Sequence, residues 1–236
     1  MYFQIVNLIY RYIKDFLSLV FPNLCCACGT SLVQYENLLC TKCLYQLPYT
    51  NHHLDKENKL AKQFWGRVQV SSASAFLLFT QKGKVQKLMH QLKYNNQPEI
   101  GVELGRLYGL ELKKLEEYQN IDVIIPVPLH PKKQKKRGYN QSEQFANGLS
   151  QSLDKPIDTQ ILKRIKFADS QAFMNRSKRH ENMKTVFKAY GSTALPGHVL
   201  LVDDTITTGA TLEACVIELN KIGIKNIHIA GIAFTA

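Results

Sequence analysis

The stretch VLLVDDTITTGAT, residues 199–211, places four apolar residues before two adjacent aspartates, and a cluster of threonines around one glycine follows. The apolar run predicts a buried strand that delivers Asp203 and Asp204 to the carboxyl edge of a sheet. The segment after them leads into a helix. Backbone N–H groups at a helix N-terminus, with threonine hydroxyls and a glycine beside them, form a cradle for phosphate. The stretch therefore predicts an anion site at the end of a strand.

The two aspartates need a different role from the loop, because carboxylates repel phosphate. They are suited to accept hydrogen bonds from a neutral diol or to hold Mg²⁺ through water. A phosphate in the loop and a diol on the acids together describe a ribose 5-phosphate. A Walker B strand is the alternative, but the chain contains no G-x-x-x-x-G-K-[ST] loop and no G-x-G-x-x-G. A turn without a ligand does not explain two acids and four threonines in nine residues.

The surrounding sequence predicts an α/β domain. Apolar strands are expected at residues 121–129, 161–165, 198–204 and 227–234, and helices at residues 140–153, starting at Asn140, and 211–223, stopping at Gly223. Such alternation implies a parallel sheet covered on both faces. Upstream, residues 68–80 alternate like a strand, and residues 85–94 and 99–118 have helical spacing.

The chain divides into two predicted parts, residues 1–50 and residues 51–236. The first part begins with a helix at about residues 2–20, in which Arg11, Lys14 and Asp15 interrupt the apolar run. This helix is therefore neither a spanning helix nor a signal peptide. It packs on the rest of the protein, or it associates with a membrane surface. The polar stretch TNHHLDKENK predicts a linker or exposed loop, with both histidines, His52 and His53, in solvent.

Four of the six cysteines form two C-x-x-C pairs, Cys25 with Cys28 and Cys40 with Cys43. Eleven residues separate the pairs, and four thiolates at this spacing suit tetrahedral Zn²⁺. Cys26, inside the first pair, is a bystander or a substitute for Cys25. A thiolate metal cluster implies a reducing compartment, which favours the cytoplasm. The two remaining predictions are that Gly29 allows a tight turn and that Cys215 belongs to the core.

The chain is basic, with a net charge of +11. This charge favours a polyanionic partner such as nucleic acid, a phosphorylated metabolite or an acidic membrane surface. Five cations cluster at residues 132–137, and residues 163–188 carry eight basic residues against two acidic ones. The two runs are either solvated, mobile basic loops or parts of one anion site.

These motifs together resemble a known family. VLLVDDTITTGATL is similar to the 5-phosphoribosyl-1-pyrophosphate (PRPP) binding signature of type I phosphoribosyltransferases. FPNLCCACG with the later C-x-x-C, LKYNNQPEIGVELGRL, IIPVPLHPKKQKKRGYNQSEQFA and SQAFMNRSKRHENMKTVF follow the order of the competence protein ComF family of that superfamily. The resemblance covers nearly the whole chain. It implies a type I phosphoribosyltransferase-like parallel sheet flanked by helices, with a small N-terminal module of the double zinc-ribbon type.

The resemblance implies roles for individual residues. Asp203 and Asp204 engage the ribose 2- and 3-hydroxyls. Arg137 and Gly138, after IIPVPL, hold pyrophosphate, and Arg137 with the two aspartates makes the catalytic set. The 5-phosphate is wrapped by Thr205, Thr207, Thr208, Gly209, Ala210 and Thr211. Residues 171–187 form a mobile hood with Arg179 and Asn182 at family-like positions, and His180 there is a candidate general acid or base.

Two functions follow from these observations. In the first, the protein is a Mg²⁺-dependent phosphoribosyltransferase in which cations, Arg137 foremost, stabilise the leaving pyrophosphate, while the lysines of KKQKK are solvated or steering charges. No segment spells a purine, pyrimidine or orotate pocket, so the acceptor stays open. In the second, the protein is a non-catalytic accessory of DNA uptake in natural transformation. As the resemblance implies, it then binds single-stranded DNA or a partner helicase at the inner face of the membrane.

Overall fold

The computed structural model describes residues 21–165, 186–191 and 195–235. The chain divides into two compact units, Met1–Leu47 and Pro48–Ala236. The helix expected at residues 2–20 lies outside the described residues. Within the part of the chain that the structure describes, every helix is too short or too polar to cross a membrane.

The first unit is organised by two turns that each present a pair of cysteines. After Cys25 the backbone turns tightly, and the Gly29 N–H donates to the Cys25 carbonyl oxygen at 2.8 Å. Gly29 has a φ of +79°, which confirms the predicted need for a permissive residue. The second turn opens helix α2, Thr41–Gln46, whose N-cap is Cys40.

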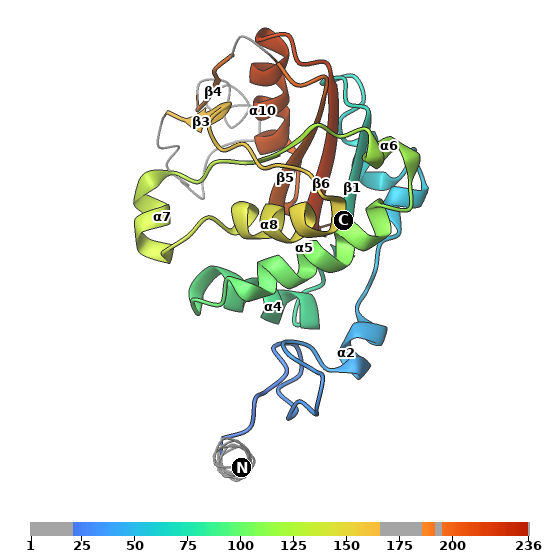
Figure 1. Ribbon diagram of the computed structural model, residues 1–236, viewed down its shortest axis with the longest axis vertical. Coiled ribbons are helices and arrows are strands. Elements are labelled where there is room, and N and C mark those ends of the chain that lie inside the picture. The colour runs from blue at the N-terminus through green and yellow to red at the C-terminus, as the bar shows by residue number, and fades with distance from the viewer. Residues whose placement is uncertain (1–20, 166–185, 192–194, 236) are drawn as a thin grey trace, which may run out of the picture. The chain divides into compact units, whose positions relative to one another are not determined.

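The second unit contains a four-stranded sheet in the order β1, β6, β5, β2 (Figure 1). Each neighbouring pair of strands is parallel, which confirms the predicted α/β class. The strand β5 lies inside the sheet, between β6 and β2. Ligands of such sheets bind outside the carboxyl ends of the strands. The four strands are β1 Ser72–Leu78, β2 Val123–Pro126, β5 His198–Ile206 and β6 Asn226–Phe234.

Helices and short elements connect the strands. In chain order they are η1 His52–Leu54, α3 Lys59–Lys62, α4 Lys84–Tyr94, α5 Glu99–Leu112, α6 Glu116–Gln119, α7 Pro131–Arg137, α8 Gln141–Leu153, β3 Leu162–Arg164, β4 Phe187–Ala189 and α10 Ala210–Lys221. The predicted cap of α8 is confirmed, since the Asn140 side chain accepts from the Ser142 N–H. Gly223, with a φ of +102°, follows the end of α10 as predicted. The helix expected at residues 99–118 is interrupted, because Leu115 between α5 and α6 has extended backbone.

Side chains from both faces of the sheet are buried. On one face, Ala75 of β1 and Leu201 of β5 share an apolar cluster with Cys215 of α10. On the other, Phe76 of β1 stacks on Tyr108 of α5 with ring centroids 4.9 Å apart. Successive strand residues point to opposite faces, so neighbouring Ala75 and Phe76 mark the two sides. Both faces are therefore covered, and Cys215 is in the core as predicted.

Helices α5 and α8 run side by side at unusually close range (Figure 1). A Cβ atom on Gly148 would lie 1.9 Å from the Val102 carbonyl oxygen, and one on Gly105 would lie 2.2 Å from the Phe145 carbonyl oxygen. Only glycine fits where two backbones approach this closely. The pair fixes the position of α8, whose first turn faces the carboxyl end of β5.

The strand predicted at residues 161–165 does not join the parallel sheet. It forms β3, which pairs antiparallel with β4 in a separate two-stranded ribbon. Leu162 and Phe187 of this ribbon are buried in the cluster beneath α10. A central parallel strand is buried on both faces, and the charges of Lys163 and Arg164 are incompatible with that position.

The prediction that His52 and His53 are exposed is wrong. Both side chains are partly buried in η1: His52 lies edge-on to Phe234 at 5.4 Å and His53 edge-on to Tyr108 at 5.6 Å between ring centroids. Burial lowers the pKa of each imidazole. The polar stretch is ordered by Asn58, whose side-chain amide donates to the Ala73 carbonyl oxygen of β1 at 2.9 Å.

Candidate functional site

The acid pair lies within the last residues of β5. The Ser142 hydroxyl, from the first turn of α8, donates to Asp203 Oδ1 at 2.9 Å, and the Asp204 N–H donates to the same oxygen at 2.8 Å. Lys93 of α4 contacts the second acid, with its Nζ 3.1 Å from Asp204 Oδ1. Lys93 Nζ also donates to Thr205 Oγ1 at 2.9 Å. Three elements thus converge on two adjacent carboxylates.

The environment of Asp203 disfavours its charge. Burial, and next the negative charge of Asp204, raise the pKa of Asp203 to about 7, against the smaller effects of Ser142, the Asp204 N–H and Lys93. A carboxylate that is half protonated near neutral pH gains most from a positive or hydrogen-bond-donating ligand. Ribose hydroxyls and a hydrated divalent cation both have this property.

The loop after β5 leads directly into the start of α10. Thr207 and Thr208 are exposed, and Gly209 has a φ of +71° as the N-cap residue of this helix. A Cβ on Gly209 would lie 3.0 Å from the ring of Phe64, so the loop packs closely on the segment before β1. No side chain caps the first N–H groups of α10 among the described residues. These donors are suited to an anion. Ala210 and Thr211 form the first turn of α10 and are partly exposed.

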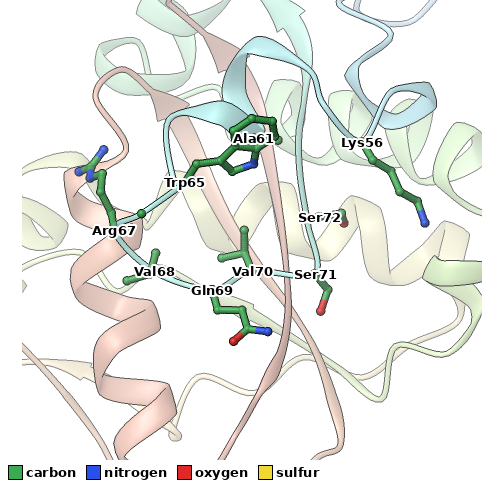
Figure 2. A pocket seen from close by; sticks show the side chains of 10 residues that line it. Lys56, Ala61, Trp65, Arg67, Val68, Gln69, Val70, Ser71 and Ser72 are labelled. Carbon is green, nitrogen blue, oxygen red and sulfur yellow. The ribbon is translucent and has the colours of Figure 1, made fainter.

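Arg67, from the segment before β1, contacts both this loop and α10. Its Nη1 donates to the carbonyl oxygens of Gln63 at 2.9 Å and Thr208 at 3.0 Å, and its Nη2 forms an ion pair with Glu213 of α10. Figure 2 shows Arg67 beside a hollow of about 590 Å³ that also borders Trp65 and Lys56. Lys56 is paired with Glu117 at 3.2 Å. Arg67, at the edge of this hollow, supports the loop. The acids do not line the hollow and lie instead at the carboxyl end of β5.

The first basic run is a helix. Residues 131–137 form α7, so the interpretation of this run as a mobile loop is wrong; Pro131 starts the helix and Gly138, with a φ of +85°, ends it. The Gly138 N–H donates to the Gln134 carbonyl oxygen at 2.7 Å. Arg137 Nη1 donates to Gln141 Oε1 at 2.7 Å. The guanidinium therefore contacts Gln141, the first residue of α8, which precedes Ser142 in the chain.

Lysines within α7 have different environments. Lys132, Lys135 and Lys136 are exposed, as predicted. Lys133 is partly buried, and its pKa is lowered by burial and then by the charges of Arg164, Arg137 and Lys93. The prediction that all these lysines are solvated is thus wrong for Lys133, because α7 turns one side toward the protein. Lys133 thus lies among three other cations, and one of these, Lys93, contacts the acid pair directly.

The hood residues predicted from the resemblance fall mostly outside the described structure. Arg179, His180 and Asn182 belong to the undescribed residues 166–185. The described part of the second basic run forms the ribbon of β3 and β4.

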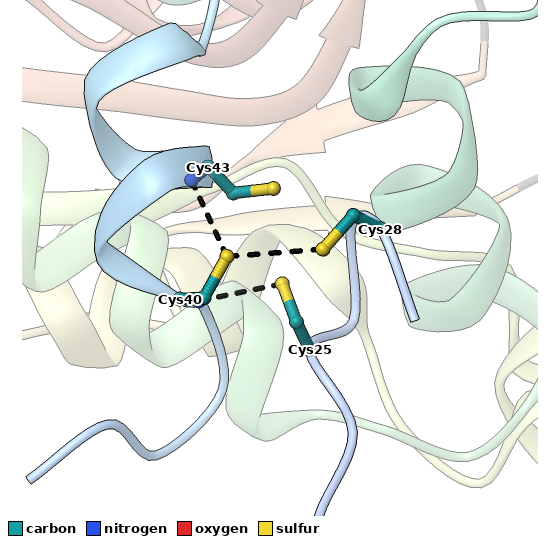
Figure 3. A group of neighbouring side chains, drawn as sticks. All are labelled: Cys25, Cys28, Cys40 and Cys43. Carbon is teal, nitrogen blue, oxygen red and sulfur yellow. Dashed lines mark hydrogen bonds between the residues drawn. The ribbon is translucent and has the colours of Figure 1, made fainter. Parts of the chain in front are cut away.

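The four predicted metal ligands lie together (Figure 3). The Sγ atoms of Cys25, Cys28, Cys40 and Cys43 all lie within 4.8 Å of one another, and Cys26 is outside the group. Cys28 Sγ and Cys40 Sγ are 3.7 Å apart. Tetrahedral zinc with bonds of about 2.3 Å needs sulfur pairs at about 3.8 Å. Hydrogen bonds with Thr30 lower the pKa of Cys28 to about 6, whereas burial raises that of Cys43 to about 12. The donor set fits zinc.

Residues 139–235 match the family model described as "Phosphoribosyl transferase domain". The fold and this match define the chain as a protein with a phosphoribosyltransferase-type domain. It is 32% identical over 220 residues to "Competence protein F" of Haemophilus influenzae, over 89% of this chain and 96% of the relative. It is 30% identical over 218 residues to "DNA utilization protein YhgH" of Escherichia coli O157:H7, over 90% and 91% of the two chains. The chain belongs to the ComF family.

Among solved structures, the chain matches a purine phosphoribosyltransferase from Pyrococcus horikoshii at 25% identity, over 57% of this chain and 73% of that one. The TM-score of 0.35 is too low for this match to carry an argument.

Proposed function

We propose that the protein binds Mg²⁺ and PRPP and transfers the ribose 5-phosphate group to an acceptor. The observation that carries the proposal is the acid pair of β5 followed directly by an uncapped helix start. Asp203 and Asp204 accept hydrogen bonds from the ribose 2- and 3-hydroxyls. The 5-phosphate accepts from the first N–H groups of α10 and from the hydroxyls of the loop residues Thr207, Thr208 and Thr211, where Gly209 and Ala210 allow close approach.

Cations on α4 and α7 support a pyrophosphate subsite. Lys133 of α7 lies near both Lys93 and Arg137, and the combined charge of these three side chains suits a highly charged leaving group. In the transfer, the bond between the anomeric carbon and the pyrophosphate oxygen breaks, and its electron pair leaves with pyrophosphate. The acceptor forms the new bond and loses its proton to solvent. Arg137 stabilises the charge that grows on pyrophosphate.

In this proposal Lys93 changes partner on ligand binding. It now contacts Asp204 Oδ1 and Thr205 Oγ1, two groups assigned to the ribose phosphate. A ribose diol on Asp204 competes with this ammonium, which then turns to the nearby pyrophosphate. The backbone N–H of Gly138 already donates to the Gln134 carbonyl oxygen at the end of α7. The role proposed for Gly138 is therefore to turn the chain after Arg137.

Two metals are part of the proposal. The crowded negative charge of Asp203 and Asp204 suits Mg²⁺ held through water, where the ion supplies charge neutralisation for pyrophosphate. Zinc on the four thiolates holds the first unit together, since that unit has few other buried side chains among its described residues. Four thiolates on a metal require a reducing compartment, so the proposal includes a cytoplasmic location.

Calorimetric titration with PRPP and Mg²⁺ tests the proposal. The natural protein is expected to bind, and the variant Asp203→Asn/Asp204→Asn to lose binding by at least about a hundredfold. Asp154→Asn is the matched control, because Asp154 is exposed at the end of α8 and its left-handed backbone accepts asparagine. Equal binding by the natural protein and the double variant would refute the assigned site.

A second candidate function is binding of single-stranded DNA without turnover, either alone or beside a partner helicase at the membrane surface. It is favoured by the exposed lysines of α7, Lys132, Lys135 and Lys136, and by relatives whose names refer to competence and DNA utilization. Anisotropy of a labelled oligonucleotide at several salt concentrations tests it. Glutamine at all three positions should reduce both affinity and its salt dependence, and unchanged binding would reject this surface.

A further inference from the structure

A cavity of about 370 Å³ lies at the carboxyl end of β2, the strand that pairs with β5, and no role has so far been assigned to it. Its apolar wall includes Pro126, Pro128 and Leu129, which follow the end of β2. Glu143 and Thr159 add polar groups, and Arg164 of β3 lines the same space. The cavity thus combines one apolar wall with a lining that is otherwise polar, so it suits a ligand with one apolar face and several polar groups.

The cavity is next to the proposed ribose position. Pro126 is the register partner of Val202, the residue before Asp203. Glu143 follows Ser142, whose hydroxyl donates to Asp203 at 2.9 Å. Both walls are therefore close in the fold to the segment that carries Asp203. The charge of Asp203 also acts on Arg164, so this cavity is the nearest candidate for a molecule that meets the ribose at Asp203.

Arg164 is the unusual group in this cavity. Its Nε is enclosed by protein and has no hydrogen-bond partner among the described residues. The guanidinium carbon lies 5.2 Å from the ring centroid of Phe187, so stacking holds the side chain in place. Burial lowers the pKa of Arg164, whereas Asp203 raises it. A buried donor without a partner is unfavourable, and an anion in the cavity would supply the missing acceptor.

We propose that this cavity receives the acceptor of the transfer and that Arg164 selects a flat heterocycle bearing one carboxylate. The inference rests on the proposed function, since an acceptor exists only if transfer occurs. The prolines pack on the ring, Arg164 binds the carboxylate through Nε and a terminal nitrogen, and Glu143 or Thr159 accepts from a ring N–H. The Glu143 carboxylate disfavours a more highly charged anion in the same cavity.

The test compares flat rings that differ only in charge. The probes are pyridine-3-carboxylate against pyridine-3-carboxamide and uracil-6-carboxylate against uracil, titrated into the full-length protein without PRPP. In at least one pair, the carboxylate is expected to bind about tenfold more tightly than the neutral partner. A ratio near one for both pairs would overturn the proposal.

Variants assign the preference to Arg164. In Arg164→Gln the ratio should fall to about one, and in Lys163→Gln, which changes the neighbouring cation of the same cavity, it should stay near ten. Arg164→Lys keeps the charge and the alkyl stem but lacks the Nε donor, and is expected to lose most of the preference with the fold intact. A preference that persists in Arg164→Gln and Arg164→Lys would refute the role of Arg164.

Two further measurements separate this inference from the proposed function. Titration of the same variants with PRPP and Mg²⁺ reports on the ribose phosphate and pyrophosphate subsites and not on the acceptor, and Arg164→Gln should bind PRPP within about twofold of the natural protein. Failure of PRPP binding in the natural protein, with the carboxylate preference present, would refute the transfer but keep the anion site. Displacement of the carboxylate probe by inorganic pyrophosphate would instead assign Arg164 to the leaving group and overturn the acceptor assignment.

Discussion

Asp203→Asn isolates the charge of one carboxylate in the acid pair. Asparagine has nearly the same shape, and its side-chain oxygen accepts the same hydrogen bonds from the Ser142 hydroxyl and the Asp204 N–H. The change therefore removes a negative charge that burial and Asp204 disfavour, with little change in packing. We expect the variant to have a larger free energy of unfolding than the natural protein at pH 8.

The magnitude follows from the pKa of Asp203, which rises from 3.8 to about 7 on folding. Between these values the folded protein keeps a proton that the unfolded chain releases. Ionisation therefore destabilises the fold as the pH rises from about 4 to 7, and has no further effect above that range. At about 1.4 kcal/mol per pKa unit the shift amounts to at most about 4 kcal/mol. Partial solvent exposure of the carboxylate reduces the expected effect to about 2–4 kcal/mol.

Urea unfolding in Mg²⁺-free buffer measures this difference. The single tryptophan, Trp65, reports on the unit that contains the acids. The stability difference between Asp203→Asn and the natural protein should grow from pH 4 to 7 and then stay constant, with unchanged slopes in urea. Asp154→Asn, at an exposed position, should show no such trend. A variant less stable than the natural protein, or a difference independent of pH, would refute the reasoning.

Three other predictions concern the remaining parts of the molecule. Arg137→Ala should weaken pyrophosphate binding about tenfold or more and leave ribose 5-phosphate binding unchanged in calorimetry; equal weakening of both would reject its position at the leaving group. Metal analysis of the reduced protein should find about one zinc per chain. The zinc should be retained in Cys26→Ser and lost in Cys43→Ser. Natural protein without zinc would refute the assignment of the four cysteines as a zinc site. Gly148→Ala should lower the free energy of unfolding by about 2–3 kcal/mol, because α5 and α8 have no room for a methyl group between them. Gly191→Ala is the control and should not lower it, since the nearest atoms to the added methyl group are 3.9 Å away. Gly148→Ala with the stability of the natural protein would contradict the close packing of the two helices.

Features that depend on local pattern could be predicted from the sequence. The apolar run before Asp203 marks β5, Asn140 marks the start of α8, and Gly223 marks the end of α10. The cysteine pairs likewise come together at the predicted spacing. For the strand and the helix ends the signal lies within one turn or strand, where residue type and backbone conformation are directly linked, and for the cysteines it lies in the short spacing of the two pairs.

Contacts between distant segments could not be predicted in this way. Lys93 reaches a hydroxyl 112 residues later, and Arg67 pairs with a glutamate 146 residues later. Neither lysine nor arginine has a local pattern that identifies its partner. The burial of His52 and His53 has the same cause, because the aromatic rings beside them come from β6 and α5. The composition of a segment shows that it is polar, but only tertiary packing determines which of its side chains are exposed.

The hydrogen bonds of Arg67 affect how the phosphate loop meets a ligand. One guanidinium joins two backbone carbonyl groups and the carboxylate of Glu213, so the loop and the start of α10 are tied to the segment before β1. The conformational entropy of this loop is therefore lost during folding and not during recognition. In the proposed function this loop is a preorganised receptor, and its affinity for a phosphate depends on the hydrogen bonds that it donates rather than on the ordering of a mobile segment.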